Sequence, residues 1–187
     1  MKMKKKWTTI IITAVAAAGL ACGCGNPQKE GVKALEDGEY QEAETQFQEM
    51  ARSSDREESA EGYRGLGMTY YEMEDYAGAL EAFEQALENG ARQSTQLYNL
   101  MGVCAMQTEN YEAALEYIQS GLALADTSSD EKDQPSEDLL REMKYNEIIC
   151  YERQADWESA KQKADEYLDE YPDDEAVQRE AEFLETR

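Results

Sequence analysis

The chain has 187 residues, of which 41 are acidic and 18 are basic, and its formal net charge is −23. It contains no histidine, so an imidazole general base, a histidine-activated nucleophile and a histidine-ligated zinc ion are excluded. The acidity argues against a nucleic-acid partner, because affinity for phosphate groups comes mostly from lysine and arginine.

Residues 1–21 predict a signal for export. Four lysines lie within the first six residues, and 15 uncharged, mostly apolar residues follow from Trp7 to Ala21. This run is shorter than the ~18 residues that span a bilayer, and it is typical of the apolar segment of a signal peptide. The remaining 14 basic and 41 acidic residues carry a net charge of −27. An uncleaved N-terminal anchor and an ordinary secreted protein are the alternatives, and each also places the body outside the cytoplasm.

The end of this leader resembles the lipobox of bacterial lipoproteins, in which small residues precede a cysteine. The segment reads Ala18-Gly19-Leu20-Ala21-Cys22-Gly23-Cys24. The resemblance implies cleavage directly before the cysteine and a diacylglycerol on its thiol. Cys22 is the preferred site because Leu20 then lies close to the cut, and Cys24 is the alternative. Since each buried CH₂ contributes about 0.8 kcal/mol, the lipid and the linker 22–29 would tether the body to the extracytoplasmic face of a bacterial cell membrane.

A pattern of four positions recurs along the body with a period of about 35 residues. A small residue is followed, at offsets of 9, 12 and 16, by an aromatic residue, an alanine and a large apolar residue. Three copies follow this pattern: Gly31, Tyr40, Ala43 and Phe47; Gly67, Tyr76, Ala79 and Phe83; Gly102, Tyr111, Ala114 and Ile118. A fourth, divergent copy consists of Ile148, Trp157, Ala160 and Ala164. Periods of this size are typical of helical arrays.

Each copy predicts two amphipathic helices. In the second copy, Tyr63, Leu66 and Tyr70 have the spacing of one helix face. Short acidic turns, such as Glu74-Asp75, separate the first helix from the second. In the first three copies the glycine and the alanine are small where the two helices must approach closely, and in every copy the aromatic residue begins the second helix. Runs of alternating β-branched residues are absent, so no strand is predicted.

The second copy reads Tyr63-x₂-Leu66-Gly67-x₂-Tyr70 and then Ala79-x₃-Phe83, and it resembles the tetratricopeptide repeat family. The resemblance implies an all-α solenoid of about four helix-turn-helix repeats over residues 30–174. The expected units cover about 24–57, 60–93, 95–128 and 141–174. Residues 175–187 have apolar residues at helical spacing and a charged opposite face, so they are expected to form the capping helix that such arrays need.

The last two copies are 46 residues apart, which leaves room for a polar insert at 126–138. Asp126, Ser128, Asp130 and Glu137 have the spacing of calcium ligands in an EF-hand loop, but Glu131 stands where that loop needs glycine. We therefore predict a solvated loop, whose composition cannot bury a core, and no metal site.

Two further cysteines, Cys104 and Cys150, occupy equivalent positions in adjacent units. Neighbouring helices pack about 8–10 Å apart, which is too far for a disulfide, so two buried free thiols are predicted. Without a histidine or a basic neighbour, neither thiol is expected to be a nucleophile. The carboxylates are spread over helix faces and no glycine-rich phosphate loop is present, so we expect no enzyme, no cofactor and no small-molecule substrate.

The resemblance also implies that the first helix of each unit lines a concave groove. The residues expected there are Arg64, Asn99 and Tyr145; Met68, Val103 and Ile149; and Tyr71, Met106 and Glu152. Exposed apolar patches with polar rims mark partner sites, although packing between units is an equal interpretation of these positions. The Lys/Asn pattern with which some family members clamp a C-terminal carboxylate is not visible in this chain.

The sequence thus predicts a membrane-tethered, non-enzymatic scaffold that binds a protein or peptide along the groove, and the acidity favours a basic partner. The alternative is a structural subunit of an envelope assembly or secretion complex, which docks by its convex face or its cap.

Overall fold

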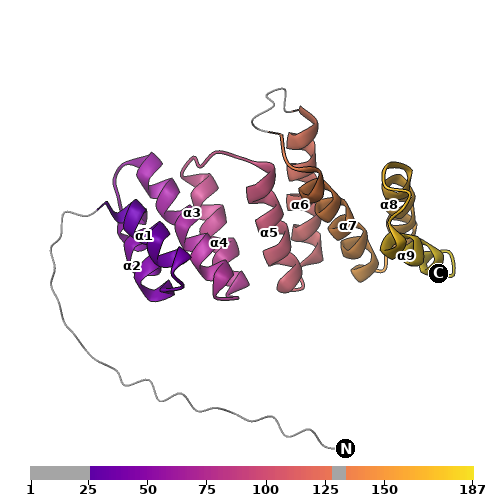
Figure 1. The fold of residues 1–187 in the computed structure, drawn as a ribbon, viewed down its shortest axis with the longest axis horizontal. Coiled ribbons are helices and arrows are strands. Elements are labelled where there is room, and N and C mark those ends of the chain that lie inside the picture. Colours follow the sequence, from indigo (N-terminus) through magenta and orange to yellow (C-terminus); the bar gives the residue numbers. More distant parts are fainter. Residues whose placement is uncertain (1–25, 128–133) are drawn as a thin grey trace, which may run out of the picture.

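A computed structural model describes residues 26–127 and 134–187. Within these residues the secondary structure consists of nine α-helices, without a strand, which follow one another along the long axis of the molecule (Figure 1). The helices are α1 Pro27–Glu36, α2 Tyr40–Ala51, α3 Arg56–Glu72, α4 Tyr76–Glu88, α5 Thr95–Gln107, α6 Tyr111–Thr127, α7 Glu137–Arg153, α8 Trp157–Glu170 and α9 Glu175–Leu184. The predicted all-α solenoid is confirmed. The predicted leader and both candidate lipidation sites, Cys22 and Cys24, lie outside the described residues.

The turn inside each helix pair has the same backbone geometry in all four pairs. One residue with a positive φ ends each first helix: Gly38 (φ 74°), Glu74 (60°), Glu109 (60°) and Ala155 (58°). The residue that follows directly precedes the next helix, and in two pairs its carboxylate accepts a hydrogen bond from a backbone N–H of the first turn, as the N-caps Asp75 and Asp156 do. The turns predicted from the acidic residues are therefore a left-handed residue followed by the N-cap of the second helix.

The small and the large residue of each sequence copy meet inside a helix pair. A Cβ atom added to Gly31 would lie 2.9 Å from the ring of Phe47, one on Gly67 would lie 2.4 Å from the ring of Phe83, and one on Gly102 would lie 2.8 Å from Ile118 Cγ1. In these three pairs the first helix leaves a gap and the second helix fills it, as the sequence pattern predicts.

The fourth pair, α7 and α8, reverses these sizes. Ile148 on α7 and Ala164 on α8 are both fully buried and belong to the same core cluster. The first helix here supplies the large side chain and the second helix supplies the small one. The divergent fourth copy is therefore an exchange of sizes that keeps the interior filled.

Successive pairs are joined by tyrosine hydroxyls that reach carboxylates on the preceding pair. Tyr70 on α3 donates to Glu44 Oε1 on α2 at 3.0 Å, and Tyr117 on α6 donates to Glu84 Oε1 on α4 at 2.6 Å. Burial and these neighbouring carboxylates raise the pKa of both tyrosines. Both hydroxyls therefore stay protonated at neutral pH and remain donors between the pairs.

The last helix, α9, closes the array as the predicted cap. Val177 and Leu184 are 1% and 2% exposed and complete the core cluster that contains Ile148. Asp174, the N-cap of α9, accepts a hydrogen bond from Tyr167 at 2.8 Å and pairs with Arg141 at 3.1 Å. These contacts fasten α9 to both α7 and α8.

The two cysteines of the described chain, Cys104 and Cys150, are free and buried, as predicted. Burial raises the pKa of both thiols to about 12, so they stay protonated at neutral pH. Across residues 26–127 and 134–187, no helix combines the length and the apolar character that crossing a bilayer requires.

Candidate functional site

The first helices of the pairs line one face of the array, which we call the first-helix face. A hollow of about 280 Å³ opens there among α1, α3 and α5. Its apolar walls consist of Val32 and Leu35 from α1, Met68 from α3, and Leu97 and Leu100 from α5. Val32 is 44% exposed, so apolar surface at this hollow faces solvent. We call it the N-terminal hollow.

Two phenylalanines from the second helices lie beneath the N-terminal hollow. Phe47 on α2 and Phe83 on α4 are almost fully buried, yet both contribute to its lining. Both rings cross α3 where that helix carries glycine, because a Cβ on Gly65 would lie 2.3 Å from Phe47 and one on Gly67 would lie 2.4 Å from Phe83. The residues that let the helices approach therefore also give the hollow an aromatic floor.

The charged residues that line the N-terminal hollow are two arginines and one glutamate, Glu61. Arg64 on α3 and Arg92 on the segment before α5 both line it, and Arg64 pairs with Glu61 at 2.6 Å. The same two arginines line an adjoining hollow of about 370 Å³ that extends to Leu124 and Thr127 at the end of α6. The side chain of Arg64 is 54% exposed. Two arginines thus line the same hollows in a chain whose net charge is −23.

The first-helix face becomes acidic towards α7. Ser94 and Gln96 line both the N-terminal hollow and a hollow of about 550 Å³ between α5 and α7, in which the charged residues are Asp138 and Glu142. Glu142 accepts a hydrogen bond from Asn99 Nδ2 at 3.2 Å. We call Asp138 and Glu142 the acidic shelf. Neither forms an ion pair with any residue that the structure describes.

A pair of carboxyl groups lies farther along, where α7 meets α9. Burial, the charge of Glu180 and a hydrogen bond with Glu180 raise the pKa of Glu152 to about 7. Burial, followed by the charges of the same two glutamates, also raises the pKa of Tyr145. Adjacent carboxylates repel each other, so the pair Glu152–Glu180 shares one proton in a fraction of the molecules at neutral pH.

The predicted groove residues occupy several kinds of position. Arg64 and Met68 line the N-terminal hollow, and Tyr145 lines a hollow of about 280 Å³ between α7 and α9. Tyr71 packs edge-on against Tyr76, with ring centroids 5.7 Å apart. Asn99 is only 7% exposed, so its contribution to this face is the hydrogen bond by which it positions the carboxylate of Glu142.

The remaining predicted positions are half-buried: Val103, Met106, Ile149 and Glu152. Met106 packs against the core cluster that contains Cys150, and therefore takes part in packing between pairs. The predicted groove residues thus divide into those that line a hollow and those that pack between helix pairs.

The sequence-based assignment missed the contribution of the first pair. Val32 and Leu35 precede Met68 and Tyr71 by 36 residues, which is the spacing of the first two sequence copies. Applying that offset to α1 would have found both. Arg92 belongs to no repeat position, because it reaches the hollow from the segment between α4 and α5.

Neither a metal-holding cluster nor an ionised thiol lies among the described residues at neutral pH. In the two described stretches of chain, no group of cysteine or acidic side chains is arranged to hold a metal ion. Of the four residues with the spacing of calcium ligands, Asp126 lies in α6 and Glu137 is the first residue of α7. The other two, Ser128 and Asp130, lie outside the described residues. The buried thiols are protonated. What the first-helix face offers is an apolar hollow, lined in part by Arg64 and Arg92, that adjoins the acidic shelf.

Comparisons with known proteins agree with this architecture. Two family models of the tetratricopeptide repeat match the chain, one over residues 64–129 and the other over residues 145–174. Among solved structures, a crystal structure of MamA protein is 14% identical and superposes with a TM-score of 0.68, covering 84% of this chain and 78% of its own. MamA 41-end from Desulfovibrio magneticus RS-1 is 17% identical, with a TM-score of 0.67 and coverage of 88% and 87%. At these identities the likeness shows the fold alone. No curated protein sequence matches the chain.

Proposed function

Because the chain belongs to the tetratricopeptide repeat family, we propose that it is a non-enzymatic scaffold that binds a protein or peptide along its first-helix face. The repeats indicate a protein-interaction scaffold. In the proposal, a lipid on Cys22, or on Cys24, holds the scaffold at the extracytoplasmic face of a bacterial cell membrane.

The N-terminal hollow is the observation that carries this function. Val32, Met68 and Leu100 present apolar surface there, and polar side chains such as Gln28 and Gln96 surround it. Exposed apolar patches with polar rims are typical of sites that bind a partner. A methionine in the wall adapts its shape to different side chains, which suits a surface that accepts an extended segment.

Replacing Met68 by glutamate should abolish binding of the partner without unfolding the chain. The carboxylate would stand in the apolar hollow, and binding would then bury an unpaired charge. Crosslinking of the tethered chain in its native cell, followed by mass spectrometry of the crosslinked proteins, measures the loss. Met73→Glu is the matched control, because Met73 is 39% exposed at the turn between α3 and α4, outside the hollow.

Two further results interpret a loss of partner binding in Met68→Glu. Circular dichroism of both variants should match that of the unchanged chain. If Met68→Glu captures the same partners as Met73→Glu, the groove assignment is wrong, and docking by the convex face or the cap takes its place.

Substituting Cys22 by alanine should release the protein from the membrane. The reason is that the thiol would be the attachment point of the lipid, and stable anchoring requires the acyl chains. Metabolic labelling with palmitate and fractionation of membranes measure the effect, with Cys24→Ala as the matched control that keeps both label and location. Release by Cys24→Ala instead would assign the lipid to the second cysteine, and retention in both variants would refute the lipid tether.

A further inference from the structure

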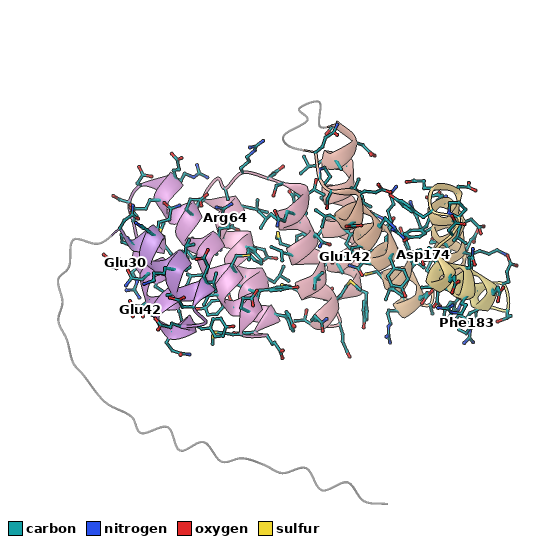
Figure 2. All side chains as sticks on the ribbon, viewed as in Figure 1. Glu30, Glu42, Arg64, Glu142, Asp174 and Phe183 are labelled. Carbon is teal, nitrogen blue, oxygen red and sulfur yellow. The ribbon has the colours of Figure 1, made fainter. Side chains whose placement is uncertain are left out.

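The N-terminal hollow and the acidic shelf form one continuous surface on the first-helix face. Ser94 and Gln96 line both hollows, and α5 lies between α3, which carries Arg64, and α7, which carries Glu142 (Figure 2). Leu100 belongs to the wall of the N-terminal hollow, while its neighbour Asn99 holds the carboxylate of Glu142. A single extended segment that fills the hollow therefore continues directly onto the shelf.

The acidic shelf is a site for a hydrogen-bond donor with positive charge. Asp138 and Glu142 form no ion pair within the described chain, whereas Arg141 between them is engaged with Asp174 at 3.1 Å and stacks 4.9 Å from the ring centre of Tyr171. Asn99 Oδ1 is buried without a hydrogen-bond partner among the described atoms, next to the carboxylate that Asn99 holds. Carboxylates and an unsatisfied acceptor together favour an ammonium or guanidinium group.

The N-terminal hollow itself disfavours such a group. Its charged lining residues are Arg64, Arg92 and Glu61, and Glu61 pairs with Arg64 at 2.6 Å, so the lining holds more arginine than acid. Like charges placed across an interface oppose binding, so a basic side chain is directed from the hollow to the carboxylates of α7. This polarity sets which end of a bound segment lies in the hollow and which lies on the shelf.

From this polarity we propose that the bound segment places an apolar side chain in the N-terminal hollow and a lysine or arginine on the acidic shelf. This inference rests on the proposed function, in which a segment binds along the first-helix face, and it specifies which side chains that segment carries. Neighbouring helices lie about 8–10 Å apart and an extended chain advances about 3.3 Å per residue, so each helix spacing takes about three residues. The hollow includes α5 and α3, which lie one and two first helices before α7, so about three to six residues separate the two side chains.

Labelled octapeptides test this chemistry on the purified chain by fluorescence anisotropy. The first peptide contains two leucines, a four-residue glycine-serine spacer and two lysines; two others carry glutamine or glutamate in place of the lysines. We expect the lysine peptide to bind about tenfold more tightly than the glutamine peptide, the glutamate peptide to bind most weakly, and the differences to shrink in 1 M salt.

Charge reversal on the protein locates the effect. Glu142→Lys should invert the order, so that the glutamate peptide binds more tightly than the lysine peptide. Glu81→Lys makes the same charge change on the exposed side of α4, where no described residue pairs with Glu81, and should preserve the original order. Equal effects of the two variants would show a general attraction by net charge and overturn the assignment to the shelf.

The peptide measurements distinguish failure of the proposed basic residue on the shelf from failure of the proposed binding along the first-helix face. If all three peptides bind alike and Met68→Glu abolishes their binding, the groove stands and the basic residue is refuted. If Met68→Glu leaves binding of the lysine peptide unchanged, the groove itself is refuted. If no peptide binds at millimolar concentration, the proposed segment chemistry is overturned, while the crosslinking experiment decides the groove separately.

Discussion

Replacing Ile148 by glycine should cost the fourth helix pair several kcal/mol, and adding Ala164→Phe to the same chain should recover much of that loss. Ile148 and Ala164 are both 0% exposed, and they hold the positions that glycine and a large apolar residue hold in the first three pairs. Ile148→Gly leaves a cavity, for which truncation of a buried aliphatic residue costs about 2–5 kcal/mol, and glycine in a helix adds about 1 kcal/mol. Ala164→Phe alone overpacks the same space and costs about 1–3 kcal/mol.

The two changes together restore the arrangement of the other pairs, so their coupling energy should be large and favourable. Urea denaturation followed by the fluorescence of Trp157 measures it, because Trp157 begins α8 and reports on this pair. Ile149→Gly is the matched control: it introduces glycine one residue along the same helix, at a half-buried position. If the double variant is no more stable than the sum of the single effects predicts, the exchange of sizes is not the reason for the divergent copy.

Gly62→Ala should destabilise the chain although alanine is the better helix former. A Cβ atom at Gly62 would lie 2.3 Å from the backbone nitrogen of Ala51 and 2.7 Å from the carbonyl carbon of Met50. The obstacle is backbone, which cannot rotate away, so α2 and α3 would have to separate. We expect a net loss of about 1–3 kcal/mol, opposite in sign to the ~1 kcal/mol gain that helix propensity alone predicts.

Thermal and urea unfolding of the variant measure this loss. Gly31→Ala provides a graded comparison, because the nearest atoms there belong to the ring of Phe47, at 2.9 and 3.0 Å, and a side chain yields more easily than backbone. Gly62→Ala should therefore lower the midpoint further than Gly31→Ala. A Gly62→Ala variant as stable as the unchanged chain would show that the two helices are not held at this distance in solution.

Much of the fold follows from local signals in the sequence. The offsets of 9, 12 and 16 residues predict two helices in each unit, and the glycine–phenylalanine pairs predict which residues meet inside the first three units. The same pattern shows only divergence in the fourth unit. That Ile148 and Ala164 exchange sizes became visible once both were seen to be fully buried in one cluster.

The candidate site was predicted in part. Arg64 and Met68 come from the repeat pattern, and Val32 could have come from it. Asn99 was expected on the groove surface by its repeat position, and in the structure it is 7% exposed and positions Glu142 from α7. No periodic pattern marks such a contact, because its two residues are 43 positions apart and lie on either side of the insert.

The sequence by itself determined that this chain is a helical array with a capped end, because helix periodicity, turn residues and small–large pairing act over less than one repeat length. Only the tertiary structure decided where apolar and charged groups converge. The net charge of −23 gave no sign that Arg64 and Arg92 line one hollow, or that Asp138 and Glu142, which form no ion pair with a described residue, line the hollow next to it. Such convergence depends on how successive pairs stack on one another, and that geometry results from the packing of all the helices together.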